Sequence, residues 1–302
     1  MNNICQICGL EKPEDNHYYK YHKIKLKDYV EKFYPKNDIY SSEKIEFKSW
    51  DSYFLTDFNN KNNLRKYLES ISKGEGIIYL KNWLMRRKQS KNLIYAPGQF
   101  EIRSLQYPSI KFFHKYYGQE SYEKICLELN LKLRYNYNNL PEFKYNPQEI
   151  LIDSREIKPY KFDIPIKIQK LNFADYAPVP NFNNIFVERK EISDWAGVMS
   201  NGYERFQKEL QRAKDHNAYI IILIESSYND LLSINYLPQT KWIKASSEFL
   251  MKKVRDLYLK FDNFQMVCGG TRKECISLFN KIIRIKNIQL FDIQYLINTN
   301  KI

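Results

Sequence analysis

Three charged residues end an apolar, strand-like segment of this chain. Residues 184–190 read NIFVERK, so Glu188, Arg189 and Lys190 directly follow three apolar side chains. Side chains at positions i and i+2 of a strand share a face, so Glu188 and Lys190 are expected on one face and Arg189 on the other. A charge that loses its water without gaining a partner is costly. The segment therefore predicts that Glu188, Arg189 and Lys190 have partners of opposite charge. Whether these partners are side chains or a bound cation decides what reaction the site could support.

Carboxylates elsewhere in the C-terminal half supply such partners. Two strand-like segments end on acids, LIDSRE with Asp153 and Glu156 and NFADY with Asp175. If Asp175 lies on a strand next to Glu188, the two carboxylates repel each other unless a cation lies between them. Mg²⁺ and Mn²⁺ prefer such oxygen ligands, acidify water and stabilise charge on a phosphate, and Lys190 could position that water or the scissile group. The alternative is a solvated strand end, because an E-x-K triplet is common by chance in a Lys-rich chain.

The elements that must position these residues alternate between strands and helices. Phe206, Leu210 and Ala213 repeat at helical spacing, and YIIILIE is a continuous apolar run typical of a strand covered on both faces. This alternation predicts an α/β domain, with a central mixed sheet, mostly parallel, flanked by helices. The strand segments are 149–153, 184–190, 219–225 and 264–268, with helices after each of the last three.

The acidic segments together resemble the XPF-type nuclease domain of the PD-(D/E)XK superfamily. Its pattern is V-D-x-R-E, G-D-Y and E-R-K-x-x-x-D, then a Gln-bearing helix and an I-E strand. The matching residues are Asp153, Arg155, Glu156, Asp175, Tyr176, Glu188, Arg189, Lys190, Asp194, Gln207 and Glu225. The resemblance implies a restriction-endonuclease-like fold in which Asp175 and Glu188 bind metal, Lys190 acts on the water, and Asp153, Arg189 and Asp194 support the site.

Two departures from that pattern bear on structure. Ala174 stands where the family has the glycine of G-D-Y, and the segment between Asp153 and Asp175 is short for the family's usual first helix. No helix-hairpin-helix pair, which relatives use for dimerisation and branched-DNA binding, is recognised after the nuclease segment. Cleavage of flaps is therefore not carried over with the resemblance.

The N-terminal segment has the spacing of a zinc site. Cys5, Cys8, His17 and His22 form C-x2-C-x8-H-x4-H, and Zn²⁺ takes four such ligands in a tetrahedron. The spacer is shorter than in a common C2H2 finger and resembles the compact fingers of Ros/MucR-like bacterial regulators and some phage proteins. The alternative is a reduced cysteine pair with unrelated histidines.

Positive charge concentrates in the middle of the chain. The net charge is +13, and residues 61–137 carry 15 basic and 6 acidic side chains, a surplus of 9. Such a surplus favours a polyanionic partner, because neutralised phosphates release counterions. The stretch PSIKFFHKYYGQESYEKICLELNL predicts two short helices around Gly118, compatible with a helix-turn-helix and faintly similar to homing-endonuclease-associated repeats. The candidate phosphate contacts are Arg86, Arg87, Lys88, Lys91, Arg103, Lys111, Lys115 and Arg134, although a solvated position suits each one equally well.

Several classes of protein are disfavoured by composition. Five scattered cysteines do not form a disulfide framework, and the longest apolar run, 218–224, is too short to cross a bilayer. No signal peptide is recognised. We therefore expect a cytoplasmic protein of a bacterial or phage-infected cell, without a membrane partner and with its oligomeric state, including a homodimer, left open.

Taken together, these features predict a Mg²⁺- or Mn²⁺-dependent DNA endonuclease of phage or mobile-element type. Its expected parts are a zinc-finger-like module at 1–36, a mainly helical basic DNA-binding region at 37–140 and a nuclease domain at 146–302. The alternatives are a nuclease specific for branched DNA and a DNA-binding regulator whose nuclease fold is inactive.

Overall fold

The computed structural model describes residues 69–302, except 92–93, 105–108, 119, 235–236 and 238–242. The chain divides into two compact units, and each is described by itself. One unit takes residues 1–96 and 106–133, and the other takes 97–105 and 134–302. The predicted zinc-finger module lies outside the described residues.

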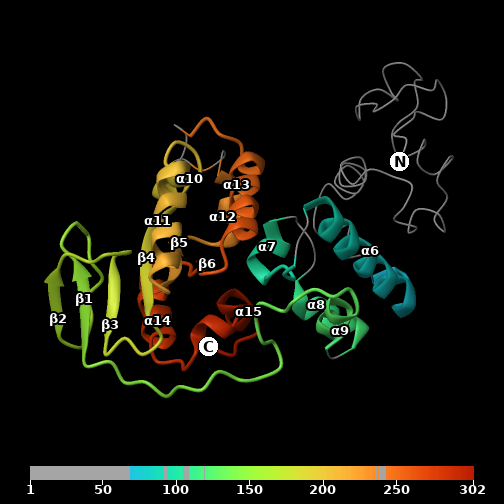
Figure 1. Cartoon of the computed structure of the whole chain (residues 1–302), viewed down its shortest axis with the longest axis horizontal. Coiled ribbons are helices and arrows are strands. Elements are labelled where there is room, and N and C mark those ends of the chain that lie inside the picture. Colours follow the sequence, from blue (N-terminus) through green and yellow to red (C-terminus); the bar gives the residue numbers. More distant parts are fainter. Residues whose placement is uncertain (1–68, 92–93, 105–108, 119, 235–236, 238–242) are drawn as a thin grey trace. The chain divides into compact units, whose positions relative to one another are not determined.

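Helices form the described part of the first unit (Figure 1). They are α6 (Lys73–Lys91), α8 (Ile110–Tyr117) and α9 (Ser121–Glu128). Helix α8 begins at Ser109, whose hydroxyl accepts a hydrogen bond from the amide of Phe112, and ends at Gly118 with φ of 101°. A side chain is strained at that φ, so glycine suits the sharp exit from the helix. The predicted pair of helices around Gly118 is thus confirmed.

A six-stranded mixed sheet forms the centre of the second unit (Figure 1). Its order is β2-β1-β3-β4-β5-β6; β1 pairs with β2 in parallel, β3 runs antiparallel to both β1 and β4, and β4, β5 and β6 are parallel. The strands are β1 (Glu149–Asp153), β2 (Ile166–Gln169), β3 (Tyr176–Val179), β4 (Ile185–Glu191), β5 (Tyr219–Glu225) and β6 (Phe264–Cys268). The predicted α/β class with a mixed sheet is confirmed.

Helices cover both faces of the strands β4 to β6. They are α10 (Ile192–Met199), α11 (Tyr203–Asp215), α12 (Tyr228–Leu232), α13 (Ser247–Lys260), α14 (Arg272–Ile282) and α15 (Ile293–Asn298), with α7 (Gln99–Ser104) and the 3-10 turn η3 (Ile288–Leu290). Ile220, Ile222 and Ile224 of β5 pack into one core with α10, α11 and α13. The side chain of Leu223 faces the other way, and it approaches Gly269 together with Cys275 of α14.

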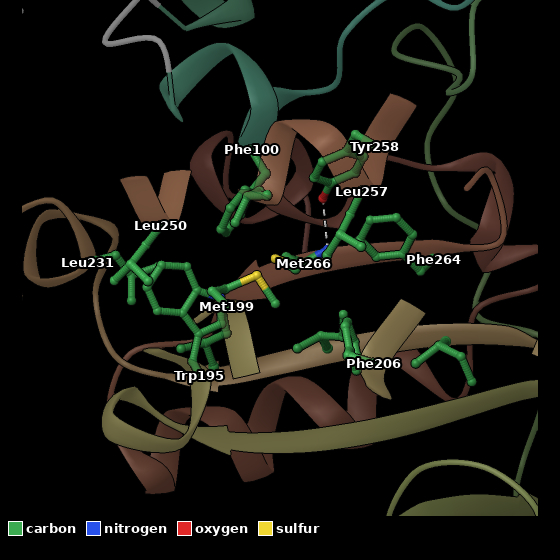
Figure 2. Packing of buried hydrophobic residues seen from close by; sticks show 14 of the residues in the cluster. Phe100, Trp195, Met199, Phe206, Leu231, Leu250, Leu257, Tyr258, Phe264 and Met266 are labelled. Carbon is green, nitrogen blue, oxygen red and sulfur yellow. Dashed lines mark hydrogen bonds between the residues drawn. The ribbon is translucent and has the colours of Figure 1, made fainter. Parts of the chain in front are cut away.

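The core beneath α10, α11 and α13 is built from large side chains. Figure 2 shows Trp195, Met199, Phe206 and Leu250 gathered around β5 and β6, with Phe100 of α7 among them. Each fully buried side chain of this size contributes roughly 1.5–3 kcal/mol from removal of apolar surface from water. Residues 97–105, which the sequence placed in the basic helical region, therefore pack with the second unit.

The sheet corrects one sequence prediction, on Asp175, and agrees with another, on the segment before it. Asp175 does not end a strand, because β3 begins one residue later at Tyr176. Strand β3 is antiparallel to its neighbours, so its first residues lie beside the carboxyl end of β1 and the middle of β4. Asp175 therefore lies next to β4, the strand that carries Glu188. Residues 154–175 hold the short strand β2 and no helix, as the length of this segment predicted.

None of the helices in the described ranges has the length and apolar character that crossing a membrane requires.

Candidate active site

Alternation along β4 separates its three charged side chains. The ammonium of Lys190 makes an ion pair with the carboxylate of Glu188, while the guanidinium of Arg189 contacts Glu156 and Glu225. Glu188 and Lys190 are registered with Ile222 and Ile224 of β5, which belong to the core under α10, α11 and α13. Glu188 and Lys190 therefore lie on the α11 side of the sheet, and Arg189 lies on the α14 side, as the strand period predicted.

The main chain holds Asp175 against β4. The amide of Asp175 donates to the carbonyl of Val187 at 3.1 Å, and the amide of Arg189 donates to the Asp175 carboxylate at 2.8 Å. Ala174, just before it, has a φ of 52°, in the left-handed region that glycine adopts at least cost. A glycine would adopt this backbone turn at less cost than Ala174 does.

Burial leaves the two carboxylates of this face poorly compensated. Burial, and then the charge of Glu188, raise the pKa of Asp175 to about 8. Burial also raises the pKa of Glu188, against the opposing effect of Lys190. Burial acts to lower the pKa of Lys190, but Glu188 and Asp175 outweigh it, and its pKa is raised. The group thus has one ammonium for two buried carboxylates, an excess of negative charge that a cation would neutralise.

The donor set fits a hard divalent ion. Among the described residues, no cluster of three or more His, Cys, Asp and Glu side chains has the spacing of a metal cage. Asp175 and Glu188 together offer two carboxylates, and Mg²⁺ is usually held by one or two carboxylates with water or phosphate completing its shell. We therefore take Asp175 and Glu188 as the residues suited to hold such an ion.

The opposite face carries a balanced ionic network. Arg189 contacts Glu156 and Glu191 at 3.3 Å and Glu225 at 3.2 Å. Arg272 of α14 contacts Glu225 at 2.9 Å and Lys158 contacts Glu191 at 3.5 Å, so three cations face three acids. Burial acts to lower the pKa of Arg189, but Glu156 and Glu225 outweigh it and the pKa is raised. Each buried charge here has an opposite charge within contact distance, so this network can serve as a fixed support for β4.

Asp153 is held by hydrogen bonds at the end of β1. Its carboxylate accepts from Nε and Nη2 of Arg155 at 2.7 and 3.0 Å, from the amide of Arg155 at 2.8 Å and from the amide of Leu171 at 2.7 Å. Burial acts to raise the pKa of Asp153, but these hydrogen bonds outweigh it and the pKa is lowered. Its acceptor sites are occupied, so Asp153 fixes the loop after β1.

A family match coincides with this arrangement. Residues 152–295 match the family model of the ERCC4 domain, a span that includes β3, β4, β5 and both charged groups. The ERCC4 domain is the XPF-type nuclease domain, which the acidic motifs resemble.

Two solved structures are similar to part of the chain. XPF from Aeropyrum pernix is 18% identical over 45% of this chain and 63% of that chain, with a TM-score of 0.33. XPF from Aeropyrum pernix in complex with DNA is 19% identical over 46% of this chain and 64% of that chain, with a TM-score of 0.34. The chain thus spans less than two thirds of the length of both. No curated protein matches it.

The remaining predicted site residues of the second unit lie in different surroundings. Asp194 is exposed in the first turn of α10, where an acid favours the positive end of the helix dipole. Glu156 accepts from Arg189 and lies with the balanced network, although its charge also contributes to the raised pKa of Asp175. The structure therefore brings Asp175, Glu188 and Lys190 together, places Glu156 with Arg189, and leaves Asp194 at the surface.

Two predicted DNA contacts are engaged within the second unit. The guanidinium of Arg103 lies 4.2 Å from the centroid of the Tyr228 ring, and burial lowers its pKa. Arg134 donates to the carbonyl of Tyr258 at 3.0 Å. In the first unit, Lys88 donates to the carbonyl of Leu129, while Lys111 and Lys115 are exposed. Arg86, Arg87 and Lys91 lie on α6, and their side chains are outside the described part.

Sequence reasoning missed two supports of the second unit. Arg272 donates to the carbonyls of Lys158 and Pro159 as well as contacting Glu225. The Tyr176 hydroxyl accepts from the amide of Tyr160, and the two rings stack 5.2 Å apart. The D-Y pair in the sequence could have indicated a structural role for Tyr176. Arg272 follows a strand and two glycines and belongs to no motif that would indicate its role. The predicted zinc ligands Cys5, Cys8, His17 and His22 lie outside the described residues.

Proposed function

We propose that this protein is a metal-dependent DNA endonuclease that hydrolyses phosphodiester bonds at Asp175, Glu188 and Lys190. The single observation that carries the proposal is the grouping of the buried Glu188, the half-buried Asp175 and the Lys190 ammonium beside one face of β4. The match of residues 152–295 to the ERCC4 domain supports the same reaction class and DNA as the substrate.

Each member of the group has a distinct part in the proposed reaction. Asp175 and Glu188 would hold Mg²⁺ or Mn²⁺, which supplies Lewis acidity at the phosphate and acidifies water. The amide of Arg189 fixes the Asp175 carboxylate, so this ligand is positioned before substrate arrives. The Lys190 ammonium has three donors and makes an ion pair with Glu188, so it can orient the attacking water and offset charge on the phosphate.

The chemistry is the hydrolysis of one bridging P–O bond. The water oxygen forms the new bond to phosphorus, the bond to one bridging oxygen breaks, and that leaving oxygen takes up a proton as the water loses one. Arg189 would act as a positioning residue, since its guanidinium lies on the opposite face and contacts Glu156 and Glu225, while its amide holds the Asp175 carboxylate.

The outer parts of the proposed enzyme follow from sequence. The basic region would hold DNA through phosphate contacts, with the exposed Lys111 and Lys115 as its described candidates. The module at 1–36 would bind Zn²⁺ through Cys5, Cys8, His17 and His22. An origin in a phage or mobile element remains part of the proposal.

A plasmid-nicking assay tests the proposed function. Wild-type protein should convert supercoiled plasmid to nicked or linear forms in Mg²⁺ or Mn²⁺ and lose this activity in EDTA, and Asp175→Ala and Glu188→Ala should be inactive. Equal inactivity of all three proteins would instead support a regulator with an inactive nuclease fold.

The substrate decides between a general and a structure-specific nuclease. The ERCC4 match favours testing branched DNA, so linear duplex, flap and junction substrates of equal length should be compared in the same buffer. Equal cleavage of all three would count against structure specificity, whereas cleavage confined to flaps or junctions would establish it.

A further inference from the structure

Exposed aromatic rings gather at the amino-terminal end of β4. Phe143 and Phe182 are 53% and 63% exposed, and the ring of Phe182 stacks on that of Tyr145 with centroids 4.7 Å apart and planes 26° apart. We call Phe143, Tyr145 and Phe182 the aromatic ledge. Large apolar side chains exposed side by side mark interaction surfaces more often than single exposed residues do.

Main-chain hydrogen bonds hold the ledge in place. The amides of Lys144 and Tyr145 both donate to the carbonyl of Arg284 at 2.9 Å, and Phe143 bridges to Ile285. Asn183, next to Phe182, donates to the carbonyl of Ile285 at 2.8 Å. Three segments far apart in sequence are thus joined, so the rings are presented on a fixed backbone.

The surroundings of the ledge are positively charged. Lys144 and Arg284 are exposed, and Lys286 is half-buried and lies 3.5 Å from the carboxylate of Glu142. These three cations and one acid give the joined segments a local surplus of two positive charges. An apolar protein partner needs no such charge, whereas a polyanion with flat apolar groups is attracted by the cations and can stack on the rings.

We propose that the aromatic ledge binds unpaired nucleotides of a nucleic-acid strand, with bases stacked on Phe182 and Phe143 and phosphates near Lys144 and Arg284. Every base has a π-face, so this contact selects single strands without selecting a sequence. In duplex DNA the bases are stacked on each other and their faces are unavailable to the rings.

The ledge lies close enough to the reactive face to act on the same strand. Six residues separate Phe182 from Glu188, and an extended chain rises about 3.3 Å per residue, so the two positions are at most about 20 Å apart along the chain. This inference rests on the proposed nuclease function and adds a second contact for the nucleic-acid strand, at the amino-terminal end of β4.

Binding of two labelled oligonucleotides to the full chain in EDTA tests the ledge without relying on cleavage. Fluorescence anisotropy would compare a 20-nucleotide oligo-dT strand with a duplex of the same length. Phe182→Ala should weaken binding of the single strand about tenfold, within the range expected for one lost base–aromatic stack, and change duplex binding less than about twofold. Phe182→Tyr should retain single-strand binding because it keeps the ring.

Matched variants separate stacking from general damage. Phe249→Ala removes another exposed ring, 43% exposed on α13, and should leave both affinities unchanged. Phe143→Ala should weaken single-strand binding in the same direction as Phe182→Ala, and thermal melting should show both ledge variants folded. The salt dependence of single-strand binding should keep its slope in Phe182→Ala, because no charge is removed.

Two results would overturn the proposal. Unchanged single-strand affinity in both ledge variants would show that the rings do not bind bases and would leave a protein partner as the occupant. An equal loss on single strand and duplex would show that the ledge does not read unpaired bases. Neither result bears on plasmid nicking in Mg²⁺, so failure of the ledge and failure of the nuclease proposal are distinguishable.

Discussion

Both faces of β4 carry acidic and basic side chains, but the charges are paired on one face and left with an excess of carboxylates on the other. On the α14 side, Arg189 is surrounded by Glu156, Glu191 and Glu225, and Arg272 and Lys158 supply two further cations, so three cations face three acids. On the α11 side, Asp175 and Glu188 share Lys190, and burial raises the pKa of both acids. Adjacent residues of one strand therefore separate a satisfied support from a group that lacks positive charge.

This difference shows why a buried charge alone does not identify a site. Burial and charge occur on both faces, and on the α11 side burial raises the pKa of both Asp175 and Glu188, so the charged form of these carboxylates is disfavoured. A divalent ion and a phosphate ester complete such a group, whereas they would add nothing to a balanced network.

Removing the cation of the balanced face should have the largest effect on stability. Arg189→Ala leaves Glu156 and Glu225 buried without their shared partner, and we expect a loss of about 3–5 kcal/mol in the free energy of unfolding, measured by urea denaturation. Lys214→Ala is the control, because its ion pair with Asp262 is about 42% exposed and should cost less than about 1 kcal/mol. A stable Arg189→Ala protein would break the assignment of this face to support.

Neutralising Asp153 should have a smaller effect that depends on pH. Because the pKa of Asp153 is lowered in the folded state, its contribution to stability is present above the ordinary value of 3.8 and is lost as pH falls through the folded value. Asp153→Asn should therefore cost about 2–3 kcal/mol at pH 7, since an amide nitrogen cannot accept the bonds from Arg155, and its stability should approach that of wild type in acid.

Urea denaturation at pH 7 and pH 3 measures this difference. If Asp153→Asn keeps wild-type stability at pH 7 but does not cleave DNA, Asp153 takes part in the reaction. The division between supporting and reactive carboxylates would then be wrong for this residue.

The smallest effect is expected at Ala174, whose backbone turn directs Asp175. Ala174→Gly removes a left-handed strain of roughly 1–2 kcal/mol, but it also removes a buried methyl worth about 0.8 kcal/mol and adds roughly 0.5–1 kcal/mol of chain entropy to be lost on folding. The net change in Tm should be small and cleavage should be retained. Loss of cleavage in this variant would show that the methyl group itself positions Asp175.

Much of the second unit could be predicted from the sequence. The apolar runs 149–153, 219–225 and 264–268 became β1, β5 and β6, because short continuous apolar segments between helices are typical of strands covered on both faces. The side chains of Glu188 and Lys190 share a face because the strand period is fixed.

Other features depend on contacts that sequence spacing does not encode. The direction of β3 decides where Asp175 lies, and nothing in NFADY specifies an antiparallel strand beginning at Tyr176. Arg103 and Arg134 are basic residues of the kind that contact DNA. Each instead contacts an aromatic residue more than a hundred positions away, Arg103 the ring of Tyr228 and Arg134 the carbonyl of Tyr258. Arg272 reaches Glu225 only because α14 returns to the sheet.

Glu188→Gln tests the central claim most directly, because it should separate activity from stability in one protein. The amide keeps the shape of the side chain and an acceptor for Lys190, but removes a buried negative charge. We predict that nicking of supercoiled plasmid in Mg²⁺ falls about a thousandfold, corresponding to roughly 4 kcal/mol of lost transition-state stabilisation, while the metal-free Tm stays the same or rises. Wild-type nicking by Glu188→Gln, or a lowered Tm that accounts for the lost activity, would contradict the claim that this face is built for reaction and not for support.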